Sequence, residues 1–242
     1  PDISDVDRLL KILLKLGSKI LRDKENKTLE IDNSNISLKA LAKEDLGNMR
    51  GTALFWGPLL ARFSEVAFKE LPGVCTLGAR SLIPHYKAFK DLGVEVNLTK
   101  IGVSMTSKKA KAGSFYLSEV SPTVTENSVM LACNISGTTK IFGAACEPNV
   151  RDLCEFLVKA GANIKGIGSN ILEIIGPTKF KSVEHEIISD IYEITTFLAI
   201  GACTGGDVSV TNVNEHDLEV IKNEFEKFNI HVEVKNGIAK LQ

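Results

Sequence analysis

The sequence predicts an α/β protein with mixed sheets and helices packed inside, because one local pattern repeats along the chain. In each copy an amphipathic helix ends in a short turn and a strand follows directly. Three of these helices end in glycine and the fourth ends at Asn229; both residue types tolerate the left-handed turn that closes a helix. The copies recur at intervals of about 55 to 75 residues, longer than solenoid repeats, which favours a globular assembly of similar units. They are residues 9–17 before 18–20, 85–93 before 94–96, 150–161 before 162–164, and 218–229 before 230–232.

The remaining segments fit the same class. Short alternating or apolar runs predict further strands at residues 102–106, 114–117 and 171–175. Residues 44–63 predict a helix that Gly57 and Pro58 would kink or split in two. Residues 125–134 and 190–202 are apolar on most sides, which predicts two helices buried in the domain centre.

The composition of the chain limits the classes of partner and site that we expect. The chain has 242 residues, of which 44% are hydrophobic, and a formal net charge of −1. Such a balance gives no electrostatic reason to expect nucleic acid or a membrane surface as a partner. An apolar run of roughly 18 residues, the length that spans a bilayer, is missing from the sequence. The five cysteines show no CxxC spacing, so we expect neither a zinc site nor disulfides, and a reducing, cytoplasmic location.

The loop at residues 71–80 carries the most informative chemistry. Cys75 lies between Gly73 and Gly78 and close to Arg80, so one loop can bring a thiol and a guanidinium to the same anionic ligand. A cysteine becomes a useful acid or nucleophile near neutral pH only when nearby charge tunes its pKa. The alternative is a small apolar cysteine that packs beneath a turn, which is the commoner role of a lone cysteine.

Other candidate residues have structural interpretations. His85 follows a proline at a helix start and is expected to be a cap or a residue at the rim of a ligand site. His185 alternates with two glutamates, which indicates a surface position on a strand. The other four cysteines fall on or beside apolar faces, so we expect packing roles for Cys133, Cys146, Cys154 and Cys203.

Three blocks, residues 48–51, 57–63 and 71–80, resemble the enolpyruvyl transferases of the UDP-N-acetylglucosamine 1-carboxyvinyltransferase family. Their order and spacing are specific, and the resemblance runs over essentially the whole chain. It extends over only a little more than half of a family member. Further matching segments are residues 137–139, 147–148, 152–153 and 205–208.

This resemblance implies a fold and a domain division. Family members have two similar domains, each an inside-out α/β barrel built from three βαβαββ units, with the active site between them. By that comparison, residues 1–188 are the cysteine-bearing domain without its N-terminal segment, and residues 189–242 are the first unit of the second domain. Because the chain opens at Pro1 without methionine, we expect a piece of a longer protein or a trimmed one.

The resemblance also implies a reaction. The family transfers the enolpyruvyl group of phosphoenolpyruvate to the 3-hydroxyl of UDP-N-acetylglucosamine, the first committed step of peptidoglycan synthesis, without a metal or other cofactor. Cys75 takes the role of the family's loop acid. Arg50 and Arg80 stand where family arginines line the ligand cleft, and Ser121 stands where a family serine contacts the nucleotide.

Four positions depart from the family pattern and favour an alternative reading. Val74 replaces a loop glycine, Ile83 an acidic residue, Glu119 a basic residue and Ile191 an arginine. A Lys-Asn pair that grips phosphoenolpyruvate would lie upstream of Pro1, and the expected base would lie beyond residue 242. The alternative is a divergent, inactive relative that binds a ligand or partner. Residues 190–242 are then expected to expose apolar faces and to self-associate or bind a complementing chain.

Overall fold

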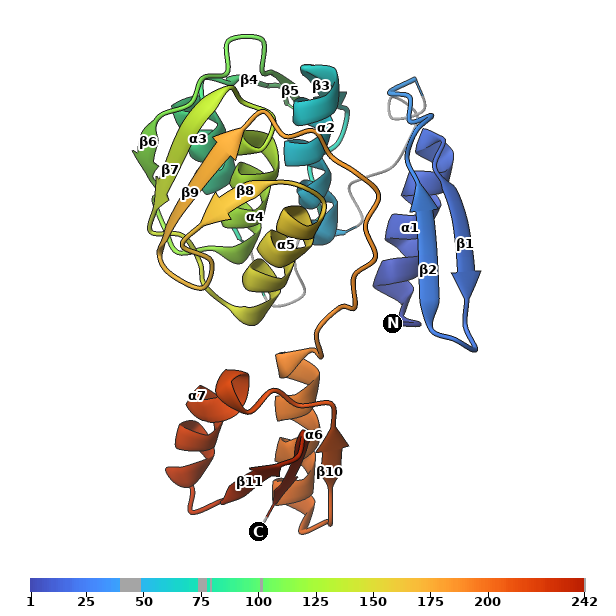
Figure 1. The fold of residues 1–242 in the computed structure, drawn as a ribbon, viewed down its shortest axis with the longest axis vertical. Helices are drawn as coiled ribbons and strands as arrows, with labels where there is room; N and C mark the ends of the chain where they lie inside the picture. The colour runs from blue at the N-terminus through green and yellow to red at the C-terminus, as the bar shows by residue number, and fades with distance from the viewer. Residues whose placement is uncertain (40–48, 74–77, 79, 101, 242) are drawn as a thin grey trace.

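The computed structural model describes the chain except for residues 40–48, 74–77, 79, 101 and 242. Its described residues form three successive parts (Figure 1). A helix with a hairpin comes first and lies beside a large α/β body, which we define as residues 50–176. A smaller C-terminal unit, residues 190–241, follows an extended connecting segment, residues 177–189.

The N-terminal part is the first copy of the repeated pattern. Its helix ends at Gly17, whose φ of 106° is the left-handed turn that glycine permits. The two strands that follow pair antiparallel. Arg62 of the large body donates to the carbonyl of Ser34 at 2.9 Å and links the two parts. The elements are α1 (Ser4–Leu16), β1 (Lys19–Asp23) and β2 (Thr28–Asp32).

The first half of the large body has a three-stranded sheet of order β3-β5-β4, in which both outer strands are antiparallel to β5. The predicted split of the helix over residues 44–63 is confirmed for its described part. A short 3-10 helix gives way to α2 at Trp56, and Gly57 and Pro58 lie in the first turn of α2. The elements are η2 (Arg50–Phe55), α2 (Trp56–Phe63), β3 (Glu65–Phe68), α3 (Ile83–Asp91), β4 (Glu95–Leu98) and β5 (Val103–Thr106).

The second half of the large body has the full βαβαββ order. Its sheet runs β6-β7-β9-β8; β6 is parallel to β7, and β9 is antiparallel to both of its neighbours. Proline near the start of each helix is tolerated because the first helical N–H groups have no partner within the helix. The elements are β6 (Ser114–Tyr116), α4 (Pro122–Ala132), β7 (Gly137–Phe142), α5 (Pro148–Lys159), β8 (Asn163–Lys165) and β9 (Ile171–Gly176).

Among its described residues, the C-terminal unit has the same order of elements as the second half of the large body, without the first strand. Its sheet order, β10-β12-β11, matches β3-β5-β4, with the last strand in the centre. Asp190 caps the first helix by accepting hydrogen bonds from the backbone N–H groups of Tyr192 and Glu193. The elements are α6 (Ile191–Thr204), β10 (Ser209–Thr211), α7 (Glu215–Glu226), β11 (Val232–Lys235) and β12 (Ile238–Leu241).

All four predicted helix–turn–strand copies are therefore present, as α1 with β1, α3 with β4, α5 with β8 and α7 with β11. The mixed α/β class is confirmed. The inside-out barrel implied by the resemblance is not confirmed, because the described strands form four separate sheets and none of these closes into a barrel.

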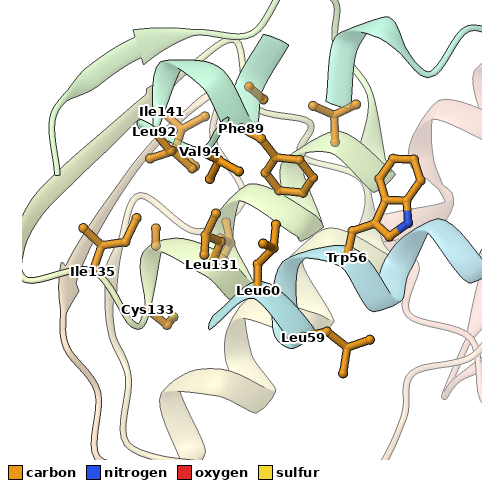
Figure 2. Close-up of a cluster of buried hydrophobic side chains, with 14 of the residues drawn as sticks. Trp56, Leu59, Leu60, Phe89, Leu92, Val94, Leu131, Cys133, Ile135 and Ile141 are labelled. Atoms are coloured by element: carbon orange, nitrogen blue, oxygen red, sulfur yellow. The ribbon is translucent and has the colours of Figure 1, made fainter. Parts of the chain in front are cut away.

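Two hydrophobic clusters form the core. The larger one joins α1 to the large body, and Figure 2 shows Trp56 and Leu60 of α2 beside Phe89 of α3 and Leu131 of α4. The smaller cluster lies within the C-terminal unit around Leu198 of α6. None of the described helices is long and apolar enough to cross a membrane.

The two helices expected in the domain centre differ. Most of α4 is buried, as predicted. On α6, by contrast, Tyr192, Phe197 and Ile200 are more than half exposed. The prediction that this helix is buried on most sides is therefore wrong, because the described elements of its own unit cover only one of its faces.

A close helix contact holds α4 in place. The backbone N–H of Gly57 in α2 donates to the Asn127 side-chain oxygen of α4 at 2.7 Å. A Cβ at Gly57 would lie only 2.4 Å from the Asn127 carbonyl oxygen, so glycine is what lets the two helices approach this closely. This contact fixes α4, which carries Ser121 at its start, against the elements that carry Arg50.

Candidate functional site

The predicted catalytic loop is described only at its flanks. Cys75 itself lies outside the described residues, so its role stays a prediction. Gly78 has a φ of 127°, a left-handed conformation that side chains rarely adopt. Two residues later Arg80 is exposed and precedes α3. The described part of the loop therefore presents its cation to solvent.

Arg50 reaches the segment that follows this loop. It is the first residue of η2, and its guanidinium Nη2 donates to the backbone carbonyl of Ser81 at 2.8 Å. Ser81 is the direct neighbour of Arg80 in the chain. The structure thus brings together the elements that carry two of the predicted ligand-binding arginines, although they are 30 residues apart in sequence. Arginine suits phosphate and carboxylate ligands because its planar fork donates two parallel hydrogen bonds.

His85 lies in α3, close enough to Arg50 to feel its charge. It is only 2% exposed and its ring meets Trp56 edge-on, with 5.7 Å between ring centroids. Burial and, secondarily, the positive charge of Arg50 lower the pKa of His85 to about 4. The imidazole is neutral at physiological pH, so the positive charge here belongs to arginine. The expectation of a cap or rim residue is wrong, since the His85 side chain is part of the core.

Ser121 lies at the start of another element, helix α4. It occupies the N-cap position of α4, yet its side chain makes no capping hydrogen bond. Its backbone carbonyl instead accepts from the Thr125 hydroxyl at 2.9 Å, and that hydroxyl accepts from the Ala145 N–H at 3.0 Å. The Ser121 hydroxyl is thus not engaged in capping, at the positive end of an 11-residue helix. Helix N-termini favour anionic ligands.

Buried polar residues anchor this end of α4, and the sequence reading missed them. Glu126 accepts a hydrogen bond from the Asn149 amide at the start of α5, at 2.9 Å. Burial raises the pKa of Glu126, the Asn149 hydrogen bond opposes this rise, and the negative charge of Glu147 adds to it. One feature of the sequence could have indicated these buried polar residues. It is the polar run from Thr125 to Ser128 inside a helix predicted to be apolar on most sides.

The other cysteines divide into two classes. Cys133 and Cys154 are buried, and burial is the main cause that raises the pKa of their thiols to about 11 and about 12. Cys146 and Cys203 are exposed, so the expected packing role is wrong for these two. Within the part of the chain that the structure describes, no group of three or more His, Cys, Asp or Glu side chains has the arrangement of a metal site.

Comparisons with known proteins concern the family and the fold. The sequence matches the family described as EPSP synthase (3-phosphoshikimate 1-carboxyvinyltransferase) over residues 1–240. A UDP-N-acetylglucosamine 1-carboxyvinyltransferase from Finegoldia magna is 38% identical over 223 residues, which are 91% of this chain and 52% of that protein. The same-named protein of Borrelia garinii subsp. bavariensis is 34% identical, over 96% of this chain and 54% of its own length.

Solved structures share the fold. The enolpyruvyl transferase NikO from Streptomyces tendae gives a TM-score of 0.79 at 18% identity, covering 99% of this chain and 58% of that one. An EPSP synthase from Acinetobacter baumannii gives a TM-score of 0.70 at 21% identity, covering 98% of this chain and 55% of that one. The chain thus has the fold of an enolpyruvyl transferase.

With this fold, and with a match that covers almost its whole length, the chain belongs to the EPSP synthase family of enolpyruvyl transferases. It spans about half the length of the curated relatives that it matches.

Proposed function

We propose that this chain takes part in transfer of the enolpyruvyl group of phosphoenolpyruvate to the 3-hydroxyl of UDP-N-acetylglucosamine, the first committed step of peptidoglycan synthesis. The observation that carries the proposal is the Arg50–Ser81 hydrogen bond, which joins η2 to the segment after the cysteine loop. The names of relatives 34% and 38% identical to the chain support the choice of the sugar nucleotide.

Each predicted residue has a role in this reaction. Cys75 gives a proton to the methylene carbon of phosphoenolpyruvate while the sugar 3-oxygen bonds to the adjacent carbon and loses its own proton. That methyl group then returns a proton to the Cys75 thiolate as the bond to phosphate breaks, which yields the enolpyruvyl ether and free phosphate; the proton of the sugar hydroxyl goes to the expected base. Arg50 and Arg80 bind the phosphate and carboxylate through bidentate hydrogen bonds, and Ser121 donates to the nucleotide at the α4 N-terminus.

The neutral state of His85 supports these roles. A second positive charge near Arg50 would be repelled by it and would need its own partner in a buried place. Because the pKa of His85 is lowered to about 4, Arg50 retains its positive charge without a charged imidazole beside it at neutral pH. The positive charge that binds anions at this point of the site then belongs to Arg50 rather than to His85.

The proposal includes a division of the chain at residue 188. Residues 1–188 form the cysteine-bearing domain and residues 189–242 begin a second domain. Two separate hydrophobic clusters support the division, since one lies on each side of the connecting segment. The cytoplasmic location stays a prediction from the cysteine pattern.

The first test is phosphate release when this chain, joined to the segments that would carry the expected Lys-Asn pair and base, is mixed with phosphoenolpyruvate and UDP-N-acetylglucosamine. We expect release that Cys75→Ser abolishes and that Arg50→Lys or Arg80→Lys weakens mainly by raising KM, because lysine keeps the charge and loses the fork. Lys87→Gln, an exposed change on α3, is the matched control. Release that persists in Cys75→Ser would contradict the assigned acid.

Two positions favour the second candidate, a relative that binds ligand without turnover. Ile83 stands where the family has an acidic residue and is 68% exposed at the start of α3. Glu119 is exposed two residues before Ser121, where its negative charge repels a diphosphate. Calorimetric binding of UDP-N-acetylglucosamine without phosphate release would select this candidate. Glu119→Lys should then strengthen binding.

The exposed face of α6 supports association with another chain. Tyr192, Phe197 and Ile200 form an apolar face that the described part of the unit leaves in solvent. We propose that a second α/β unit, from another copy of this chain or a complementing chain, covers it. Phe197→Lys should reduce the mass measured by light scattering, whereas Val220→Lys on α7 should not. A monomeric parent protein would contradict association.

A further inference from the structure

Helix α5 holds two neighbouring residues whose partners lie in different parts of the molecule. The Arg151 guanidinium donates two hydrogen bonds to the Asp217 carboxylate of α7, at 2.9 and 2.7 Å. The next residue, Asp152, lies 2.8 Å from Nε2 of His185 in the connecting segment. One helix of the large body thus contacts both the C-terminal unit and the chain that leads to it.

The Arg151–Asp217 pair is a well-built contact. Both guanidinium Nη atoms meet both carboxylate oxygens, which is the fork geometry that fixes orientation as well as distance. The Arg151 side chain is 23% exposed and that of Asp217 only 10%, so the pair is screened less than a surface ion pair. Glu155, one turn further along α5, lies 3.7 Å from Arg151 and adds a second acidic neighbour.

This pair spans two hydrophobic clusters. Leu157 and Cys154 of α5 belong to the large cluster, whereas Leu218, the residue after Asp217, belongs to the small one. Apolar burial is not directional, so it holds each body together without fixing one against the other. A bidentate ion pair between the two bodies does fix an orientation.

The Asp152–His185 contact secures the connecting segment independently. The His185 side chain is 8% exposed and its ring meets Phe156 edge-on at 5.6 Å. The backbone N–H of Lys181 also donates to the carbonyl of Ala160 at the end of α5, at 3.0 Å. The expected surface strand position of His185 is therefore wrong: the side chain is packed against α5.

Beyond His185 an open pocket lies between the connecting segment and the C-terminal unit. A cavity of about 270 Å³ is lined by residues 186–189 of the connecting segment and by Ile194, Asn214 and Asp217 of the C-terminal unit. Exposed Ile187 lies in the same stretch. The chain has room to bend between the fixed His185 and the start of α6.

From this geometry we infer that Arg151 and Asp217 form a latch that sets the orientation of the C-terminal unit on the large body. Asp152 and His185 form a separate clamp on the connecting segment. When the latch opens, the unit turns about residues 186–190 while the clamp stays closed. The inference is independent of the transfer chemistry, because it concerns only how the two bodies are held.

The chain offers natural labelling sites for a direct test. Cys146 of the large body and Cys203 of α6 are exposed, whereas Cys133 and Cys154 are buried. In a Cys75→Ser background, spin labels on Cys146 and Cys203 report the distance between the bodies by pulsed electron paramagnetic resonance. We expect one narrow distance distribution for this parent.

Latch variants should widen this distribution. Arg151→Gln and Asp217→Asn should each broaden it at least twofold, and the double variant should be no broader than either single one, since all remove the same contact. Arg151→Lys keeps the charge and loses the fork, so its distance distribution should be broader than the parent's and narrower than that of Arg151→Gln. Glu215→Gln removes another acidic charge from the first turn of α7 and is the matched control. Circular dichroism of each variant checks that α7 stays folded.

Hydrogen exchange in the connecting segment tests the clamp separately from the latch. Asp152→Asn should raise hydrogen exchange of amides at residues 179–186 at least tenfold, whereas Arg151→Gln should leave the exchange there unchanged. A distance distribution in Arg151→Gln that equals the parent's would overturn the latch. Equal broadening by Glu215→Gln would overturn it too, because the effect would then come from α7 charge rather than from the contact.

Discussion

Helices α4 and α6 precede the same succession of strand, helix and hairpin, yet they have different surroundings. α4 is packed against α2, α3 and α5, so even its polar residues Thr125 and Ser128 are buried. α6 buries Ile194, Leu198 and Gly201 against its own unit and exposes Phe197 and Ile200. One unit covers one face of such a helix; the other face requires a neighbouring unit. α6 is the more apolar of the two helices and is nevertheless the more exposed, so hydrophobicity alone does not predict burial.

The strongest test of this comparison removes one leucine from each body. Leu60→Ala in α2 should destabilise the large body by about 4 kcal/mol, because a fully buried leucine leaves a cavity in a tightly packed core. Leu198→Ala in α6 should cost about 2 kcal/mol, because the smaller cluster has more room to collapse. Urea unfolding measures both.

The fluorescence of a single tryptophan distinguishes unfolding of the large body from unfolding of the C-terminal unit. Trp56 is the only tryptophan of the chain and is buried in the large body, so its fluorescence reports that body alone. Leu198→Ala should lower the urea midpoint of part of the circular dichroism signal and leave the Trp56 transition in place. Equal shifts in both signals would show that the bodies unfold as one, contrary to the comparison.

The second prediction concerns the proton that burial in the large body keeps off His85. His85 has a pKa of about 4 when folded and about 6.5 when unfolded, so the unfolded state binds its proton first as pH falls. Its contribution to stability is complete above pH 6.5 and declines by about 3 kcal/mol on acidification to pH 4. The measurement is the free energy of unfolding against pH.

Variants isolate this effect from the carboxylates that titrate nearby. The stability difference between the parent and His85→Gln should shrink as pH falls from 6.5 to 4. His216→Gln, at an exposed position of the C-terminal unit, is the matched control. A constant difference between the parent and His85→Gln would mean that His85 binds its proton at the same pH in the folded and unfolded states.

Local rules predicted much of this fold. Gly17 and Gly161 mark helix ends by the left-handed turn that each adopts, so the four helix–strand copies followed from short-range signals. The barrel could not be tested by such signals, since closure depends on strand partners far apart in sequence. The predicted burial of α6 was wrong for the same reason. A helix that is apolar on most sides is buried only if neighbouring elements cover it, and periodicity does not reveal whether they are present.

The candidate site was partly predictable. Glycines and a cation around Cys75 indicated the loop, and the resemblance indicated Arg50, but the hydrogen bond from Arg50 to Ser81 required the fold. His185 illustrates the limit: alternation with two glutamates indicated solvent, whereas Asp152 and Phe156 of α5 bury its side chain. A partner 33 residues away leaves no trace in local alternation.

The third prediction compares glycines at close approaches of α2 and α6. Gly57→Ala should cost about 2 to 3 kcal/mol, because its Cβ would meet the Asn127 backbone at 2.4 Å and helix α4 would have to shift. Gly201→Ala should cost less, about 1 to 2 kcal/mol, because its Cβ meets side-chain atoms of Leu241 and Val208 rather than backbone, and alanine favours the helix. Thermal unfolding measures both, and equal costs would contradict tighter packing in the large body.

The fourth and smallest effect uses thiol reactivity to ask whether α6 is covered in solution. In a Cys75→Ser background, Cys146 and Cys203 should react readily with an aromatic disulfide at pH 8, because both are exposed. Cys133 and Cys154 should react only on unfolding: pKa values of about 11 and about 12 leave thiolate fractions of about one in a thousand and one in ten thousand.

Protein concentration then distinguishes the two exposed thiols. Cys203 lies three residues after Ile200, on the exposed side of α6, whereas Cys146 precedes α5 in the large body. If a second unit covers α6, the Cys203 rate should fall by a few-fold as concentration rises, and the Cys146 rate should not. Phe197→Lys should remove this dependence by disrupting the apolar face. Concentration-independent rates at both thiols would show that α6 remains exposed, and that the α/β unit is stable with one face of its central helix in water.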